Sequence, residues 1–320
     1  MLKYFKNIFA ACSLLLLASC HKGDITLLTR QVSTNTTDEL NSIAFVNDSV
    51  GYICGGTRYF IGILLRTTDG GHTWSAPDSV IPKALYSMTF FSAQEGLTAG
   101  FDGYVAYTND SAKTFSSGQY TNLPIQHMSF INRQKGVAAC GLGYRYGSVY
   151  NTSDGGHTWS QVYSDAMHAY NGAAYIDDST ALVCGYGTIL RSHDGGATFT
   201  VVKENGEIYQ EMKYINGICY AVGYQGEVIR SDDRGSTWRI VRAGNGLFSS
   251  ADHLFGVDFT DENNGYAVGE SGLMVHTSNG GQDWQTVRAF TSERLRSVHM
   301  FSATSGIVAG ADGKVYLFQQ

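Results

Sequence analysis

The stretch Thr67-Thr-Asp-Gly-Gly-His-Thr-Trp74 is the first of six copies of one eight-residue pattern, and this repeat decides the fold. Each copy keeps a hydroxyl residue, an acid or amide two positions later, and a final aromatic. The later copies occupy residues 108–115, 152–159, 192–199, 231–238 and 277–284. Their third positions are 41, 44, 40, 39 and 46 residues apart. A period in this range indicates a propeller blade or another repeat array.

The residues between two copies have the composition of short strands. In the fifth unit, residues 212–215, 220–223 and 228–231 are rich in Val, Ile and Tyr and are separated by Gly turns. A fourth such run follows each aromatic, as at residues 238–241. Four antiparallel strands per repeat make one propeller blade. The sequence therefore predicts an all-β, seven-bladed β-propeller of four-stranded antiparallel blades.

The two ends of the chain are expected to share the last blade. Residues 298–301, 306–310 and 314–318 supply three strands, and the chain ends at Gln320 without another copy of the repeat. The apolar residues 25–28 have no preceding strands of their own. Pairing these ends would close the ring and remove an exposed edge. We expect residues 20–320 to form this single domain.

Residues 1–19 are expected to be a lipoprotein signal peptide. Lys3 and Lys6 precede an apolar stretch of ten residues, which is too short to span a bilayer. The stretch ends in Leu17-Ala-Ser-Cys20, which resembles a bacterial lipobox and implies a lipid on Cys20. This predicts a membrane-anchored protein in the cell envelope, facing the periplasm or the cell surface. The alternative is an ordinary secretory signal with a chance cysteine.

Charge and cysteine content exclude several classes of function. The formal net charge is −6 and no Lys/Arg run reaches three residues, which argues against binding nucleic acid. Cys54, Cys140 and Cys184 each precede a Gly at equivalent repeat positions, which argues against pairing among them. With Cys219, they are interpreted as small buried side chains. No metal-binding, dinucleotide or nucleophile motif is present, so we expect no metal, no cofactor and no catalytic residues.

The repeated stretch has a structural explanation. Its acid can accept backbone N–H bonds within a hairpin turn, the Gly pair can adopt positive φ, and the aromatic can fold back onto the blade. The second copy departs most, because Ser111-Ala112 replaces the Gly pair. The residues given this structural role are Asp69, Trp74, Asp110, Phe115, Asp154, Trp159, Asp194, Phe199, Asp233, Trp238, Asn279 and Trp284.

These copies resemble the Asp-box, or bacterial neuraminidase repeat, of sialidases, sortilin-type receptors, xyloglucan hydrolases and photosystem II assembly and stability factors. The assembly factors are the most similar, because Arg191-Ser192 and Arg230-Ser231 fit their form of the repeat. That resemblance implies a non-enzymatic protein that binds other proteins during membrane-complex assembly. The alternative is a sialidase-like glycoside hydrolase or lectin, although the chain lacks the Arg-Ile-Pro signature of sialidases.

A partner-binding face is predicted opposite the repeated turns, where the second and third strands of each blade connect. Arg with Tyr and Phe is the composition of interface hot spots. The same residues could instead stack on a glycan or fill gaps between blades. The residues assigned to this face are Arg58, Tyr59, Phe60, Phe101, Tyr144, Arg145, Tyr146, Tyr186 and Tyr224.

Overall fold

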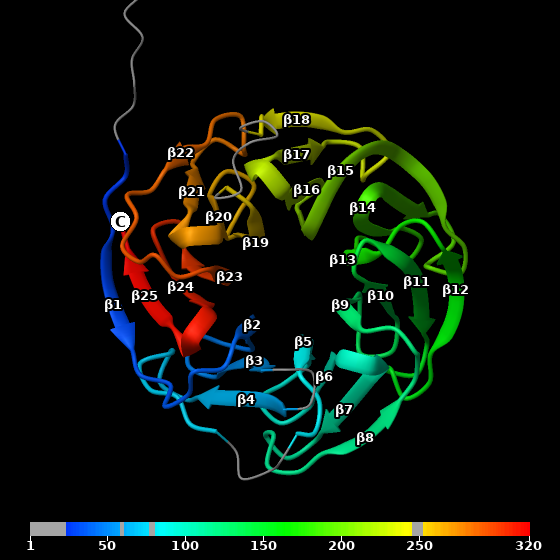
Figure 1. Cartoon of the computed structure of the whole chain (residues 1–320), viewed down its shortest axis with the longest axis horizontal. Helices are drawn as coiled ribbons and strands as arrows, with labels where there is room; N and C mark the ends of the chain where they lie inside the picture. Colours follow the sequence, from blue (N-terminus) through cyan, green and yellow to red (C-terminus); the bar gives the residue numbers. More distant parts are fainter. Residues whose placement is uncertain (1–23, 58–60, 77–80, 245–251) are drawn as a thin grey trace, which may run out of the picture.

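The strands form a ring of antiparallel sheets around a central axis (Figure 1). This computed structural model describes residues 24–57, 61–76, 81–244 and 252–320. Four residues singled out in the sequence, Cys20, Arg58, Tyr59 and Phe60, lie outside the described residues, as does the expected signal peptide. The innermost strand of each sheet lines the axis and the outermost strand lies on the rim.

Two sheets lie at the start of the ring. The first contains β2 (Leu40–Phe45), β3 (Gly51–Thr57) and β4 (Ile61–Thr67). The second contains β5 (Leu85–Phe90), β6 (Gly96–Gly100), β7 (Tyr104–Thr108) and β8 (Ser116–Gln119).

The middle of the ring holds one four-stranded and one six-stranded sheet. The former contains β9 (Ile125–Phe130), β10 (Gly136–Leu142), β11 (Arg145–Thr152) and β12 (Ser160–Asp165). The latter contains β13 (Tyr170–Tyr175), β14 (Ala181–Ser192), β15 (Thr200–Ile215), β16 (Ile218–Gly223), β17 (Val228–Ser231) and β18 (Arg239–Arg242).

The last two sheets bring the chain back to its start. One contains β19 (Leu254–Phe259), β20 (Gly265–Gly269), β21 (Met274–Thr277) and β22 (Gln285–Thr286). The other contains β1 (Leu28–Val32), β25 (Val315–Gln319), β24 (Ser305–Gly310) and β23 (Leu295–Ser302). Short 3-10 turns join second to third strands at η1 (Phe101–Gly103), η2 (Tyr224–Gly226), η3 (Glu270–Gly272) and η4 (Ala311–Gly313).

The prediction of seven four-stranded blades is wrong. The strands of the described residues form six sheets, of which one has three strands and one has six. Two sequence units merge in the six-stranded sheet because β15 runs without a break from residue 200 to residue 215. Its first part pairs with β14 and its second part with β16. The three-stranded sheet arises because Ser75, after the first repeated turn, makes only an isolated bridge to Arg66.

The ring closes through the two chain ends, as expected. Strand β1 pairs antiparallel with β25 from Leu28↔Gln319 to Val32↔Val315. The N-terminal strand begins later than predicted, since Ile25 makes only an isolated parallel bridge to Val287. Closure gives β25 a partner along its outer edge, so the C-terminal strand is not left as an open edge.

Apolar side chains fill the spaces between neighbouring sheets. One cluster joins Val32 and Ile307 of the closing sheet to Leu40 and Trp74 of the next. Another packs β13 and β14 against β15 to β17, so the two halves of the six-stranded sheet face each other. Cys54, Cys140, Cys184 and Cys219 are buried and unpaired in these interiors, as the sequence predicted.

The repeated turns share one hydrogen-bond network. The Asp69 carboxylate accepts from Thr73 N at 2.9 Å, Thr73 Oγ1 at 2.7 Å and Thr67 Oγ1 at 2.7 Å. The turn is tied to the loop between first and second strands, because Gly70 N donates to Ser49 O at 2.9 Å. The second turn keeps this shape at the cost of strain, since Ser111 and Ala112 adopt φ of 68° and 66°.

Candidate functional site: the axial cavity and the aromatic row

A bulge opens each strand segment that lines the axis, on the face opposite the repeated turns. In β15 it lies where the part that pairs with β16 begins. In β19 the pairing with β20 passes from Leu254↔Gly269 to Gly256↔Val268, which leaves Phe255 unpaired. The same skip occurs at Arg296 in β23 and at Asn171 in β13. A bulged residue is re-aimed out of the ladder. The equivalent positions are Asn41, Tyr86, Gln126, Asn171, Gln210, Phe255 and Arg296.

A glycine at the end of the second strand makes room for six of the seven bulges, all except the one at Gln126. A Cβ on Gly269 would lie 1.8 Å from His253 O, and one on Gly310 would lie 1.9 Å from Arg294 O. No side chain fits at that distance, so the partner strand must carry glycine there. The glycines after Cys54 and Cys184 in the sequence mark these positions, and they are the signal by which the bulged residues could have been found.

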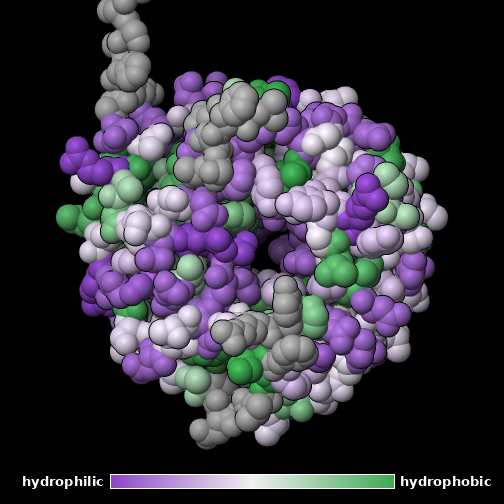
Figure 2. Space-filling model, viewed as in Figure 1, coloured by the Kyte–Doolittle hydropathy of each residue, from purple (hydrophilic) through white to green (hydrophobic). Residues whose placement is uncertain are grey.

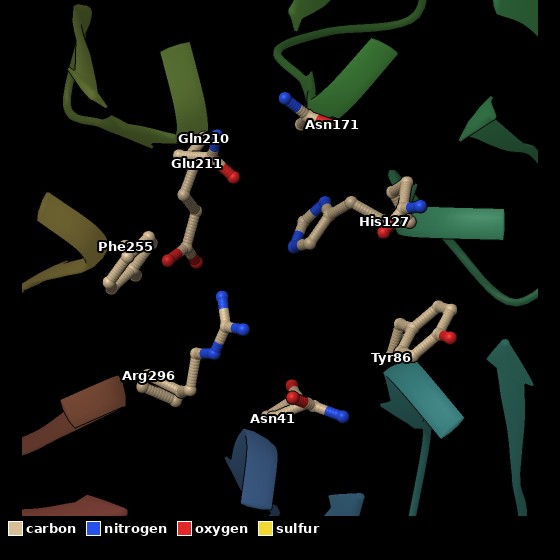
Figure 3. Close-up of a pocket in the computed structure, with 11 residues that line it drawn as sticks. Asn41, Tyr86, His127, Asn171, Gln210, Glu211, Phe255 and Arg296 are labelled. Atoms are coloured by element: carbon tan, nitrogen blue, oxygen red, sulfur yellow. The ribbon is translucent and has the colours of Figure 1, made fainter. Parts of the chain in front are cut away.

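The bulged residues surround a cavity of about 300 Å³ on the axis. Figure 3 shows their side chains arranged around one hollow, and Figure 2 shows the opening of the ring on this face. Four of the residues that follow a bulge also line the cavity: Ser42, His127, Glu211 and Ser297. The lining is mostly polar, with Tyr86 and Phe255 as its aromatic members.

Side chains at the position after the bulge accept hydrogen bonds from backbone N–H groups on the strand that lines the axis in the next sheet. Ser87 Oγ accepts from Met128 N at 2.9 Å, His127 Nδ1 accepts from Ala173 N at 3.3 Å, and Glu211 Oε2 accepts from Val257 N at 3.1 Å. A strand that lines the axis has no neighbouring strand on its axial edge. The N–H groups along that edge therefore need such partners. Hydroxyl, imidazole and carboxyl groups thus perform one structural task at equivalent positions.

Burial shifts the titration of the acid and the imidazole in this wall. Desolvation raises the pKa of Glu211 to about 8, although Lys213 acts in the opposite direction. Desolvation also lowers the pKa of His127 to about 4, so this ring is neutral near pH 7. Its Nδ1 accepts a hydrogen bond, which places the proton on Nε2.

An ion pair between half-exposed Lys213 and buried Asp258 lies next to Glu211. Lys213 Nζ is 2.6 Å from Asp258 Oδ1, and this attraction raises the pKa of Lys213. His299 Nδ1 is 3.5 Å from Asp258 Oδ2, and burial lowers the pKa of His299. Lys213 and Asp258 therefore balance each other, while Glu211 has no ion-pair partner among the described residues.

An aromatic row leads across this face to the cavity. We define the row as Tyr144, Tyr186, Tyr224, His253 and Phe255. Ring centroids are 4.9 Å apart for Tyr144 and Tyr186, and 6.5 Å apart for Tyr186 and Tyr224. Tyr224 stacks on His253 at 3.9 Å, and His253 meets Phe255 edge-on at 6.5 Å. Phe255 also lines the cavity, so the row and the cavity form one continuous surface.

Two arginines border the row where it meets the cavity. The Arg296 guanidinium lies 4.7 Å from the centre of the Phe255 ring. Its Nε donates to Glu39 Oε1 at 2.7 Å. Arg294 bonds Glu270 at 3.0 Å and Glu39 at 3.5 Å. Two cations and two carboxylates therefore hold each other in a fixed arrangement, and the cluster carries no excess charge.

The structure brings together only part of the predicted partner face. Tyr186 and Tyr224 are half-buried in the row, and Tyr144 stands at its end with 66% of its surface exposed. Arg145 and Tyr146 are exposed beside Tyr144. Phe101 lies apart, with the Lys83 ammonium 5.6 Å from its ring centre. His253, Phe255 and Arg296 were missed because no motif contains them.

The axial cavity does not combine a set of arginines with a Tyr–Glu pair, as the resemblance to sialidases would imply. Arg296 is the one arginine among the residues that line the described cavity. A Tyr–Glu pair does exist, since Tyr209 OH donates to Glu227 Oε1 at 2.8 Å. Tyr209 is fully buried, and desolvation raises its pKa, so its hydroxyl is neither accessible nor ionised near pH 7. Arg66 and Arg230 instead hydrogen-bond Tyr52 and Tyr220 beside the repeated turns.

The part of the chain that the structure describes contains neither a metal-binding cluster nor a membrane-spanning helix. No group of three or more His, Cys, Asp or Glu side chains there is arranged to hold a metal ion. No helix in the same residues is long and apolar enough to cross a bilayer.

Comparisons with known proteins agree with the fold and point to one family for part of the chain. Residues 26–180 match the family of the photosynthesis system II assembly factor YCF48. The photosystem II assembly lipoprotein Ycf48 of Synechococcus sp. (strain CC9902) is 24% identical over 161 residues. That match covers 49% of this chain and 46% of the relative, so it spans about half of each protein.

Solved structures resemble the chain over nearly its whole length. YCF48 bound to D1 peptide has a TM-score of 0.70 at 17% identity, covering 91% of this chain and 97% of that one. YCF48 from Cyanidioschyzon merolae has a TM-score of 0.68 at 16% identity, covering 91% and 98%. The WD40 β-propeller domain of Doa1 has a TM-score of 0.70 at 14% identity, covering 92% and 96%. The chain is therefore a β-propeller that resembles photosystem II assembly factors in sequence over residues 26–180.

Proposed function

We propose that this protein is a non-enzymatic assembly module that binds another protein through the aromatic row. The observation that carries the proposal is the unbroken run of ring contacts from Tyr144 to Phe255. Tyrosine offers a large, rigid contact area with a polar end, which suits protein interfaces. Arg145 and Tyr146 extend the exposed end of the row. One relative of this fold is described as bound to a D1 peptide, which supports a protein ligand.

Membrane attachment through a lipid on Cys20 is part of the same proposal. The sequence Leu17-Ala-Ser-Cys20 supports it, and a relative is named a lipoprotein. Such an anchor would place the propeller on a membrane of the cell envelope, where a membrane complex is within reach. Labelling cells with a clickable fatty acid tests this. We expect incorporation into the full chain and none into Cys20→Ser; equal labelling of both would refute the anchor.

Cross-linking in native membranes tests the protein-binding role. The full chain and a Tyr144→Ala/Arg145→Glu variant are cross-linked, captured and analysed by mass spectrometry. We expect one membrane-complex subunit to be captured at a fixed ratio by the wild type, and at least tenfold less by the variant. Gln282→Glu is the matched control, because Gln282 is exposed in a repeated turn on the opposite face. Equal capture by all three proteins would refute the proposed surface.

The glycan-directed alternative has a distinct signature in the same experiment. A lectin or hydrolase would recover glycan without a protein partner. Tyr209 bonds Glu227 and Tyr170 bonds Asp165, but both tyrosines are fully buried, so neither resembles an accessible glycosidase nucleophile. Protein binding is therefore the function that the geometry supports best.

A further inference from the structure

Amide side chains in the axial cavity have their N–H groups already engaged. Asn41 Nδ2 donates to Leu85 O at 2.8 Å, Gln126 Nε2 donates to Gly141 O at 2.9 Å, and Asn171 Nδ2 donates to Tyr209 O at 3.1 Å. Each bond fixes which end of the amide faces the backbone. The three amide oxygens accept no hydrogen bond from any described residue. Lining residues from three separate sheets therefore have amide oxygens that are available as acceptors.

Charge in and around the cavity is balanced except at one position. Arg294 and Arg296 are matched by Glu39 and Glu270. Lys213 is matched by Asp258. Glu211 accepts one hydrogen bond, from Val257 N, and forms no ion pair with a described residue. Figure 3 shows its side chain pointing into the hollow from β15. The cavity thus contains an acid that shares Lys213 with Asp258 and has no cation to itself among the described residues.

The size and walls of the cavity suit an organic cation. A volume of about 300 Å³ is at the lower end of the range for small-molecule sites. Tyr86 and Phe255 offer aromatic surface to a methylene chain or a cation. A primary ammonium has three N–H donors and no acceptor, which is the complement of a ring of oxygens.

We propose that the axial cavity binds a primary ammonium group, with Glu211 as its countercharge and the amide oxygens of Asn41, Gln126 and Asn171 as acceptors. The group can belong to a free alkylamine or to a lysine side chain of a bound polypeptide. The proposal does not depend on the protein-binding role, because a free amine needs no contact with Tyr144 or Tyr186.

Binding of the ammonium is coupled to release of a proton from Glu211. With a pKa near 8, this carboxyl is mostly protonated at pH 7 and must ionise to pair with the cation. The other charged or titratable groups that face it are His127 on β9, Lys213 on β15, Asp258 on β19, and Arg296 and His299 on β23. Burial lowers the pKa values of both histidines, which keeps them neutral as the pH rises above 7.

Calorimetric titration of the full chain with n-butylamine tests the site. Between pH 6 and pH 9 the ligand stays charged while Glu211 ionises, so we expect the affinity to rise by roughly a hundredfold. At pH 7, buffers with different ionisation enthalpies should report a proton released per amine bound. Affinity that is the same at pH 6 and pH 9 would overturn the proposal, and this reading needs no variant.

Two variants separate the charge of Glu211 from its structural bond. Glu211→Gln keeps an oxygen for Val257 N but carries no charge, so we expect binding more than tenfold weaker and without proton release. Glu204→Gln changes an exposed carboxyl on the same strand and should bind as the wild type does. Unchanged binding in Glu211→Gln, equal affinity for n-butanol, or displacement of the amine by calcium chloride would each refute the ammonium site.

Two peptides distinguish the sources of the ammonium. A lysine-containing peptide that binds more than tenfold tighter than n-butylamine, and loses this gain in Tyr144→Ala, identifies a polypeptide source. The same peptide with norleucine in place of lysine is its control. Equal affinity of the lysine peptide and n-butylamine identifies a free amine as sufficient. Failure of the protein capture with intact n-butylamine binding would refute the partner surface alone.

Discussion

The two faces of the ring are built in different ways. On the turn face, the same hydrogen bonds recur from Asp69 to Asp233, with nearly the same distances. On the cavity face, the same bulge recurs, but its side chain changes from amide to phenol, phenyl or guanidinium. Repetition of both backbone and side chain serves stability. Repetition of the backbone with a variable side chain gives a site in which the chemical group at each position can differ without a change in the fold.

The sixth turn shows how strictly the turn face conserves its bonds. Asn279 replaces the acid there, and Asp283 replaces the threonine. Asn279 Oδ1 accepts from Asp283 N at 3.0 Å, while Asn279 Nδ2 donates to the Asp283 carboxylate at 3.0 Å. The donor and the acceptor have exchanged places, and the turn is kept.

The largest effect is expected where a bulge is blocked. Gly269→Ala places a methyl group 1.8 Å from His253 O if nothing moves, so β19 and β20 must separate. We expect the free energy of unfolding to fall by about 3 kcal/mol or more in urea denaturation. Gly143→Ala is the control, because its Cβ has open space despite a φ of 62°, and it should cost about 1 kcal/mol. Equal costs would show that the bulge is not fixed by the glycine.

Lowering the pH should reduce the free energy of unfolding by removing the hydrogen bonds that the turn carboxylates accept. Hydrogen bonds from the threonine four residues later lower the pKa values of Asp69, Asp110 and Asp194 to about 2. These folded-state values lie below the unfolded value of about 3.9, so the stabilisation is complete above pH 4 and is lost as the pH falls towards 2. Chemical denaturation at pH 5, 4, 3 and 2 should follow that window. A stability that is constant across it would contradict the role of these carboxylates.

Removing one turn carboxylate should cost less than blocking a bulge. Asp154 accepts from Thr158 N at 2.9 Å, Thr158 Oγ1 at 2.6 Å and Thr152 Oγ1 at 2.8 Å. Asp154→Ala should lower the free energy of unfolding by about 1–2 kcal/mol and leave n-butylamine binding unchanged. Asp178→Ala removes a carboxylate that is 86% exposed, and should change stability by less than about 0.5 kcal/mol. A loss of n-butylamine binding in Asp154→Ala would contradict the expectation that the turn face stabilises the ring without contributing to the cavity.

The smallest effect is expected where the cavity wall exchanges one acceptor for another. Ser87 and Ser297 already accept a neighbouring backbone N–H at positions equivalent to His127. His127→Ser should therefore change the free energy of unfolding by less than about 1 kcal/mol, whereas His127→Ala leaves Ala173 N unpaired and should cost about 1–3 kcal/mol. Thermal unfolding of the two variants gives the comparison. Identical melting points would mean that this bond does not stabilise the ring.

The turns and the pairing of the chain ends could be predicted because each has a local signal. Acid, Gly pair and aromatic recur at a fixed spacing, and the unpaired strands at residues 28–32 and 315–319 complete each other. The number of sheets could not be predicted, because two repeat units form separate sheets only where the hydrogen bonding between strands is interrupted. Residues 200–215 contain no proline and one glycine, Gly206. Strand β15 therefore continues from one partner to the next.

The candidate site was only partly predictable for a related reason. Tyr144, Tyr186 and Tyr224 were found by their place in the strand connections, and the structure puts their rings in contact. Phe255 and Arg296 sit at equivalent positions of different units but share no chemistry, so no motif marks them. Only the glycine opposite six of the seven bulges recurs, and its meaning depends on a backbone contact across two strands.

Closure of the ring by Leu28 and Gln319 has a kinetic consequence. Strand β1 finds its partner only after β25 has been synthesised, so ring closure must follow synthesis of residues 315–319. Contacts of such high sequence separation form slowly, because a very long loop must be closed first. Until then β1 and β25 are both open edges that can pair with other chains. The synthesis of β25, rather than the folding of any single sheet, is expected to set the time at which these two edges are protected from aggregation.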